Sequence, residues 1–161
     1  MISLNEPNIS KKDIKSVIKT LNDNWVSSSG PIVNMFEKKI CKYSSVKNAV
    51  AFVNATSALQ IALKLIGTNN KTEIIVPTVT FVAPVNAIIY NSGSPIFMDV
   101  DKYFNIDLNK TLEFLEKKTK FKNGYTINKK TGKKILAIII VHVWGNAVFL
   151  DDIKKICKRK N

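Results

Sequence analysis

The stretch that decides the fold runs from Val50 to Gly67, with the sequence VAFVNATSALQIALKLIG. It begins as an apolar run typical of a β-strand, breaks at residues 54–57, and continues with apolar residues at intervals of three and four. This spacing places the apolar residues on one face of a helix, which can then pack on a sheet. The stretch therefore predicts a strand, a tight turn and the start of a helix.

The predicted turn carries two hydroxyl side chains, Thr56 and Ser57. The first N–H groups of a helix lack intrahelical partners, and the helix dipole adds partial positive charge at the same end. A turn with small hydroxyl residues there suits a bound phosphate. The same residues also suit a cap that satisfies only its own helix, and isolated caps of this kind are common. Both interpretations stay open on these residues alone.

Length and composition indicate one ordinary globular domain, since the chain has 161 residues of which 45% are hydrophobic. The longest apolar run, Ile135–Val143, is too short to span a bilayer, and the first residues lack a signal-peptide pattern. We therefore expect a cytoplasmic protein with no membrane partner.

Cys41 and Cys157 belong to no CxxC spacing and His142 is the only histidine, so neither a zinc site nor a disulfide framework is indicated.

The net charge of +13 could favour nucleic acid, because basic surfaces collect phosphate backbones. However, the lysines crowd into Lys117–Lys134 and Lys154–Lys160 with a single arginine, Arg159, and without a ladder of aromatic residues. This distribution predicts a solvated surface and no nucleic-acid partner. A non-enzymatic basic module that binds phosphate or nucleic acid remains the alternative function. Salt-dependent retention on polyanions that does not depend on Thr56 would support it.

Strands and helices alternate along the remaining chain. We expect helices over 11–21, from 31 onward, and over 82–90, 107–117 and 150–160, with strands over 73–77, 94–100 and 135–141. Residues 120–134 are predicted to be an exposed excursion with a turn at Thr131–Gly132, which could form a small hairpin. The alternation predicts a three-layer α/β sandwich with a mostly parallel sheet and right-handed crossovers.

Ligands of such sheets bind at the carboxyl ends of the strands. Phe81 starts a helix directly after a predicted strand, so it should converge with Thr56 if the two strands are neighbours. An ordinary core position for Phe81 is the other interpretation. Asp99 and Asp101 end the next strand, but no third oxygen-rich cluster lies nearby, so no metal site is predicted.

The loop WVSSSGP, residues 25–31, combines a large aromatic side chain with three hydroxyls. Trp25 with Ser27, Ser28 and Ser29 could clasp a polar ligand. The same loop could equally be a turn in which Trp25 is a packing anchor.

Four pieces in this order resemble the DegT/StrS family of pyridoxal-phosphate sugar aminotransferases: WVSSSGP, NATSALQIALKLIG, VPTVTFVAPVNAIIYNSGSPIFMDVD and HVWGNAVFLDDI. The resemblance covers nearly the whole chain, and the insertion NKKTGKK resembles the branch of legionaminic-acid and related nonulosonate pathways. It implies the amino-terminal part of the large domain of fold-type I aminotransferases. Residues 1–47 would form amino-terminal helices and a substrate loop, and residues 48–161 an incomplete cofactor-binding α/β domain.

The resemblance also implies roles for single residues. Thr56 and Ser57 match the turn that holds the phosphate of pyridoxal 5′-phosphate, and Phe81 matches the aromatic residue that stacks on its ring. The loop residues Trp25, Ser27, Ser28 and Ser29 match the segment that approaches the sugar. His142 belongs to an HxxG turn that is a structural signature of the family.

The implied activity is transfer of an amino group, from glutamate, to a keto carbon of a nucleotide-linked sugar, by a homodimer. The family's cofactor-binding lysine and its aspartate lie beyond the HxxG turn, in a part that this sequence does not contain. The resemblance therefore implies an amino-terminal portion that is inactive alone and carries no catalytic residue. A Rossmann-type nucleotide binder is disfavoured, since no GxGxxG follows any predicted strand.

Overall fold

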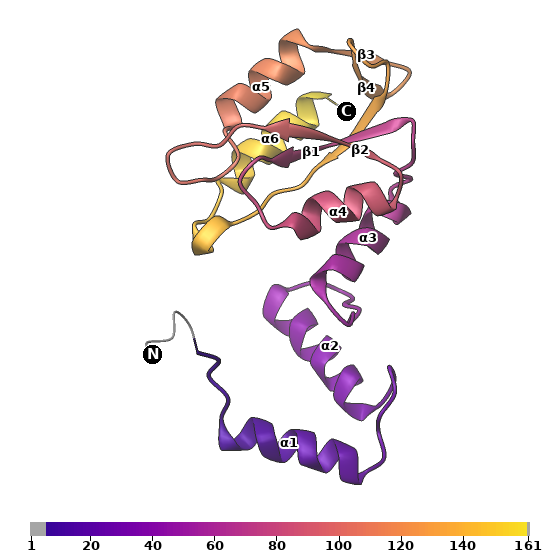
Figure 1. Ribbon diagram of the computed structural model, residues 1–161, viewed down its shortest axis with the longest axis vertical. Coiled ribbons are helices and arrows are strands. Elements are labelled where there is room, and N and C mark those ends of the chain that lie inside the picture. Colours follow the sequence, from indigo (N-terminus) through magenta and orange to yellow (C-terminus); the bar gives the residue numbers. More distant parts are fainter. Residues whose placement is uncertain (1–5, 161) are drawn as a thin grey trace. The chain divides into compact units, whose positions relative to one another are not determined.

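The computed structural model describes residues 6–160, with side chains as far as residue 158. The chain divides into two compact units, Met1–Ala51 and Phe52–Asn161, which are described separately and are called the amino-terminal unit and the sheet unit. Figure 1 shows the elements of both units. No helix within the described residues is long and apolar enough to cross a membrane.

The amino-terminal unit holds the helices α1 (Lys11–Asn22) and α2 (Pro31–Ser44), as predicted. Ser10 caps α1 reciprocally, because its hydroxyl accepts the N–H of Asp13 at 3.3 Å while the Asp13 carboxylate accepts the N–H of Ser10 at 2.8 Å. Pro31 opens α2, where its missing N–H costs nothing.

The apolar positions of α2 do not face a core in this unit. The helical spacing of Val33, Phe36, Ile40 and Tyr43 predicts that these side chains point inward, but Phe36 is 53% and Tyr43 90% exposed. No residue of α1 or α2 is buried. The prediction was wrong for this unit because periodicity shows which face of a helix is apolar, and not whether a partner covers it.

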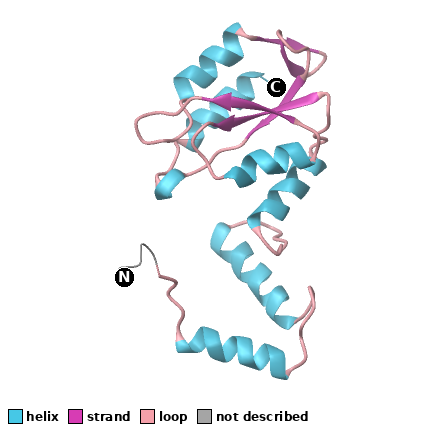
Figure 2. Ribbon diagram, viewed as in Figure 1, coloured by secondary structure: helices cyan, strands magenta, loops and turns pink. Residues whose placement is uncertain are grey.

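The sheet unit contains a five-stranded sheet in the order β2-β1-β5-β4-β3 (Figures 1 and 2). Its parallel centre consists of β1 (Thr72–Pro77), β2 (Ser94–Met98) and β5 (Lys134–Ile138), which confirms the three predicted strands. The antiparallel edge consists of β3 (Thr119–Lys122) and β4 (Tyr125–Asn128).

Helices cover both faces of the sheet, which confirms the three-layer α/β architecture. The helices α3 (Ala55–Leu65) and α4 (Val82–Tyr90) pack on one face, and α5 (Leu108–Lys117) and α6 (Leu150–Lys160) on the other. One core cluster consists of Leu63, Ile74, Val76, Ala87, Ile88 and Ile139, and the other of Ile75, Met98, Ile106, Leu115, Val148, Ile153 and Ile156. Successive residues of β1 thus enter opposite cores, as the pleat of a strand requires.

Two local predictions need correction. The apolar run Val50–Val53 does not form a strand, and Val53 is 90% exposed. The N–H of Ala51 donates to the Glu37 carboxylate of α2 at 2.9 Å, and not to a neighbouring strand. The excursion over 120–134 is part of the sheet. The predicted hairpin turn at Thr131–Gly132 is confirmed and joins the antiparallel strands β4 and β5. A second turn at Asn123–Gly124 forms the β3–β4 hairpin, with φ angles of 52° and 78° that suit an Asn-Gly pair.

Candidate functional site

A pocket of about 220 Å³ lies where β1 and β5 end. Because these strands are parallel neighbours, the segments that follow them meet at one edge of the sheet. The pocket is lined by Val79, Thr80, Phe81, Val141, His142, Val143 and Trp144. The hydroxyl oxygen of Thr80 is buried and has no hydrogen-bond partner in the described part of the chain. A mostly apolar pocket with one unpartnered polar group suits a small planar ligand.

Phe81 is the residue immediately before α4 and is 80% exposed. The exposure rules out an ordinary core position, which was the alternative interpretation of this residue. Trp144 also lines the pocket, from the turn η1 (Val143–Gly145), and is 86% exposed. Two exposed aromatic rings therefore line one pocket, where a planar ring could stack.

His142 begins the HVWG turn and is tied into it by its ring. Its Nδ1 accepts the backbone N–H of Val148 at 3.1 Å, and its carbonyl oxygen accepts the N–H of Gly145 at 3.1 Å. Trp144 and Gly145 both have positive φ angles, 54° and 81°. The histidine thus stabilises a tight turn in the pocket wall, in line with a structural signature.

The amino end of α3 is capped by Asn54. The Asn54 side chain accepts the N–H of Ser57 at 2.8 Å, so neither Thr56 nor Ser57 is the cap of its own helix. Among the described residues, the N–H groups of Ala55 and Thr56 and the hydroxyls of Thr56 and Ser57 have no protein partner. Four donors at the positive end of a helix are available to an anion.

The helices α3 and α4 adjoin near their carboxyl ends. Asn91, at the end of α4, donates from Nδ2 to the carbonyl of Gln60 on α3 at 2.9 Å. Beyond both helices, a Cβ atom on Gly93 would lie 2.6 Å from Cγ2 of Thr68. The segments at the carboxyl ends of the two helices therefore adjoin.

The structure brings together only some of the predicted site residues. Phe81 and His142 line the pocket, whereas Thr56 and Ser57 are not among its lining residues. Sequence reasoning did not single out Trp144 or Thr80. A large aromatic residue in a turn directly after a buried strand was the available signal for Trp144.

The predicted sugar-binding loop lies in the amino-terminal unit and is described on its own. The Ser27 hydroxyl donates to the carbonyl of Ser29 at 3.0 Å. Trp25 packs over Gly30, where a Cβ atom would lie 3.0 Å from the indole and where φ is 150°. Trp25 therefore is a packing anchor for this loop, while a role in sugar binding for Trp25, Ser27, Ser28 and Ser29 stays a prediction.

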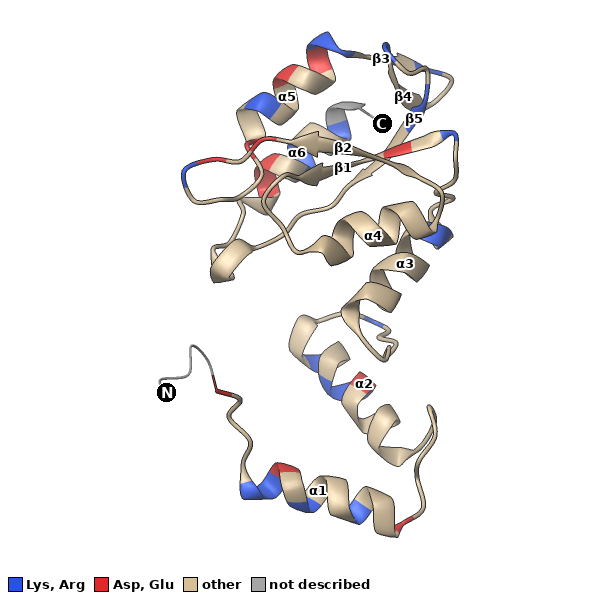
Figure 3. Cartoon of the chain, viewed as in Figure 1, with Lys and Arg blue, Asp and Glu red and all other residues tan. Residues whose placement is uncertain are grey.

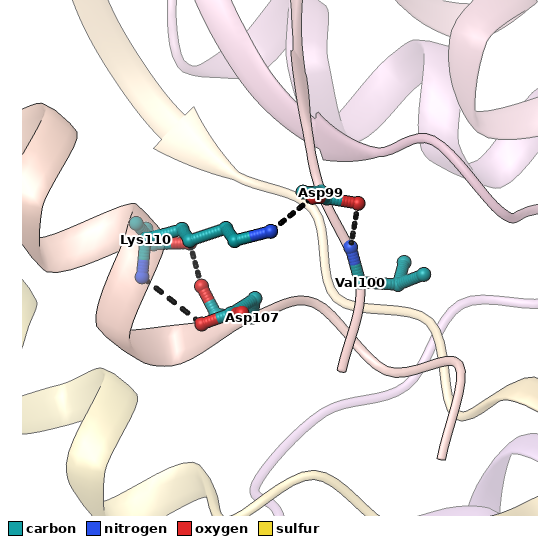
Figure 4. A network of polar contacts seen from close by, with 5 residues as sticks. Asp99, Val100, Asp107 and Lys110 are labelled. Atoms are coloured by element: carbon teal, nitrogen blue, oxygen red, sulfur yellow. Dashed lines mark hydrogen bonds and ion pairs between the residues drawn. The ribbon is translucent and has the colours of Figure 1, made fainter. Parts of the chain in front are cut away.

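The acidic residues after β2 serve the local structure (Figure 4). The Asp99 carboxylate accepts hydrogen bonds from Lys110 and from the N–H of Val100, and these bonds lower the pKa of Asp99 below its usual value. Asp107 caps α5 by accepting the N–H of Lys110 at 3.0 Å. Within residues 6–160, no group of three acidic, histidine or cysteine side chains could hold a metal ion.

An aromatic pocket at the strand ends of an α/β sheet, and a helix start with free donors, are features of ligand-binding α/β proteins, and comparison with known proteins narrows this class. The DegT/DnrJ/EryC1/StrS aminotransferase family matches residues 7–161, and the chain belongs to this family.

Named relatives act on nucleotide-linked sugars. GDP-perosamine synthase of Escherichia coli O157:H7 is 32% identical over 160 residues, which cover 99% of this chain and 40% of that protein. UDP-4-amino-4,6-dideoxy-N-acetyl-beta-L-altrosamine transaminase of Campylobacter jejuni serotype O:2 is 32% identical over 100% of this chain and 39% of its own length.

A solved structure of PseC, a Helicobacter pylori aminotransferase involved in the biosynthesis of pseudoaminic acid, superimposes with a TM-score of 0.80. It is 27% identical, and the match covers 98% of this chain and 38% of PseC. The chain thus spans about 40% of the length of the curated relatives that it matches. The predicted relation to fold-type I sugar aminotransferases is confirmed.

Proposed function

We propose that the chain is part of an enzyme that transfers an amino group from glutamate to a keto carbon of a nucleotide-linked sugar, in surface-polysaccharide or nonulosonate biosynthesis. The observation that carries the proposal is the family match over residues 7–161. The names of the relatives support nucleotide sugars as the substrate class, since they include a GDP-sugar synthase and a UDP-sugar transaminase. The complete enzyme would be a homodimer.

The cofactor of this proposal is pyridoxal 5′-phosphate, which supplies an electron sink for amino transfer when it is bound. Thr56 and Ser57 would hold its phosphate, because the amino end of α3 offers two free N–H groups and two free hydroxyls. Phe81 would stack on its ring from the start of α4. Thr80 would offer its buried, unpartnered hydroxyl to a polar atom of the ring.

The residues of the pocket do not supply the amine that a covalent bond to the cofactor requires. None of the residues that line the pocket is a lysine, so the described part of the chain offers no amine to the cofactor aldehyde there. We therefore expect these 161 residues alone to bind the cofactor weakly and not to turn over.

Binding of pyridoxine 5′-phosphate tests the proposal, because this analogue lacks the aldehyde and cannot react with the many surface lysines. Titration calorimetry should show binding of pyridoxine 5′-phosphate and at least tenfold weaker binding of pyridoxine, since a doubly charged phosphate at a helix start adds roughly 1.5–3 kcal/mol. Equal affinity for the two compounds, or transamination by the purified chain alone, would contradict the proposal.

A further inference from the structure

Asparagine is followed by glycine or serine at two positions of this chain, Asn91-Ser92 and Asn123-Gly124. In such pairs the side-chain amide can be lost spontaneously, because the small second residue lets its backbone nitrogen approach Cγ of the asparagine. In a folded chain the reaction depends on two groups, which are the attacking backbone nitrogen and the departing side-chain nitrogen. The two pairs differ in both groups.

At Asn91 both nitrogens are held by hydrogen bonds. The Asn91 Nδ2 donates to the carbonyl oxygens of Gln60 and Ala87, each at 2.9 Å. The N–H of Ser92 donates to the carbonyl oxygen of Ile89 at 2.8 Å. The Asn91 side chain is also half-buried. Moving the Ser92 nitrogen onto Cγ of Asn91 would break these hydrogen bonds at a cost in free energy, so the fold protects this pair.

At Asn123 both nitrogens are free. Within residues 6–158, neither the Asn123 side chain nor the N–H of Gly124 has a hydrogen-bond partner. Both residues are exposed at the tip of the β3–β4 hairpin. A Cβ atom on Gly124 would meet no atom within 4 Å beyond the chain neighbours. No neighbouring group therefore obstructs the approach of the Gly124 nitrogen to Cγ of Asn123.

The hairpin also carries the charge that favours this reaction. Residues 117–134 contain eight lysines and no acidic residue, and Figure 3 shows the basic positions along β3 and β4. The backbone nitrogen attacks as an anion after it loses its proton, and the intermediate formed at Cγ also carries negative charge. Ammonium groups nearby stabilise both species, and Lys122 directly precedes Asn123 in the chain.

We propose that Asn123 is the site at which the folded chain loses a side-chain amide, with water as the co-reactant. The Gly124 nitrogen bonds to Cγ of Asn123, the bond from Cγ to Nδ2 breaks, and Nδ2 leaves as ammonia with the proton of the Gly124 nitrogen. A five-membered imide remains. Water then opens the imide at one of its two carbonyls, which gives aspartate or isoaspartate. One water is consumed and one ammonia is released, and no group is oxidised or reduced.

The two products differ in their effect on the hairpin. Aspartate keeps the turn, because Asp-Gly suits the same positive φ angles as Asn-Gly. Isoaspartate carries the main chain through its own side-chain carbon, so it lengthens the two-residue turn between Lys122 and Tyr125. These two residues pair across the strands and close the hairpin. A lengthened turn no longer matches this register, and isoaspartate therefore loosens β3 and β4.

Peptide mapping by mass spectrometry tests the proposal on the full 161-residue chain after incubation at mildly alkaline pH. In the folded chain, Asn123 should convert to aspartate and isoaspartate while Asn91 stays intact. The same incubation in urea should speed the conversion of Asn91 at least about tenfold, because its three hydrogen bonds no longer protect it. The conversion of Asn123 should change much less.

Two results of this mapping would overturn the proposal. One is conversion of Asn91 as fast as that of Asn123 in the folded chain. The other is an Asn123 that stays intact in the folded chain and converts only in urea, because the turn would then protect it.

Two variants isolate the site and its products. Asn123→Gly should fold like the parent and show no conversion at the turn, because Gly-Gly suits the same turn and carries no side-chain amide. Asn123→Asp supplies the aspartate product alone. Hydrogen exchange of the β3 and β4 amides should be as slow in Asn123→Asp as in the fresh parent, and faster in the isoaspartate form separated from the aged chain. Equally slow exchange in the isoaspartate form would overturn the loosening of the hairpin.

Discussion

The backbone N–H of Val148 donates to Nδ1 of His142 at 3.1 Å, which joins the turn after β5 to the core. Val148 is 7% exposed and packs in the cluster beneath α5 and α6. The His142 ring therefore anchors the pocket wall that contains Trp144 to Val148, a buried residue of the core.

Replacing His142 with alanine should destabilise the chain by about 1–2 kcal/mol, because the partly buried N–H of Val148 loses its acceptor. The loss should appear as a lower midpoint in urea denaturation. His142→Asn is the matched control, since its Oδ1 can accept the same hydrogen bond and should restore much of the stability. Equal losses of stability in His142→Ala and His142→Asn would show that the hydrogen bond to Val148 does not stabilise the chain.

Gly93→Ala should destabilise the sheet unit by roughly 1–3 kcal/mol through overpacking. A Cβ atom there would lie 2.6 Å from Cγ2 of Thr68 and 3.2 Å from the carbonyl oxygen of Ile88. Adding Thr68→Ser removes the closer atom, so the double variant should recover part of the loss in a denaturation experiment. Strict additivity of the two substitutions would contradict the predicted contact between residues 68 and 93, which follow α3 and α4.

The parallel centre of the sheet could be predicted from the sequence because its strands are nearly continuous apolar runs, which are typical of strands buried on both faces. Ile74, Ile75 and Val76 are all fully buried. The run Val50–Val53 has the same character and forms no strand, since a strand also needs a neighbour, which local sequence does not report. The Asn123–Gly124 turn was overlooked because the surrounding lysines indicated an exposed loop, although Asn-Gly is a strong hairpin signal.

The candidate site was predictable where it depends on strand ends, and less so where it depends on turns. Phe81 follows directly from a strand-to-helix switch, and its exposure agrees with a binding role. Asn54, and not Thr56 or Ser57, caps α3, because a side chain one position outside the helix reaches the N–H of Ser57. Trp144 lines the pocket and has a left-handed backbone conformation, with φ 54°. A tryptophan in the sequence does not predict this conformation.

Acid should weaken the start of α1. Hydrogen bonds from Ser10 lower the pKa of Asp13 below its usual value of 3.8, so the ionised carboxylate is favoured in the folded helix. This contribution is present above the usual value and is lost as the pH falls through the lowered pKa. Carbon chemical shifts of residues 11–14 should move toward coil values in that acidic range. Asp13→Asn should remove this dependence, while Glu6→Gln, outside the helix, should keep it.

Thr56→Val should weaken pyridoxine 5′-phosphate binding by about 1–2 kcal/mol, the scale of one hydrogen bond to a charged group, which is roughly 5- to 30-fold. Valine keeps the shape of the side chain and removes only the hydroxyl. Thr20→Val is the matched control, because that hydroxyl donates to the carbonyl of Ser16 within α1 and lies outside the proposed site. Unchanged affinity of the Thr56 variant would remove this hydroxyl from the phosphate site.

The most direct measurement of the phosphate site is a two-dimensional amide NMR titration of the ¹⁵N-labelled chain with pyridoxine 5′-phosphate. We expect saturable shifts of the N–H signals of Ala55 and Thr56, together with those of Phe81 and Trp144 at the pocket, and smaller shifts with pyridoxine. Shifts confined to the lysines of residues 117–134, with Ala55 and Thr56 unmoved, would show that the phosphate meets only the basic surface and would contradict the account.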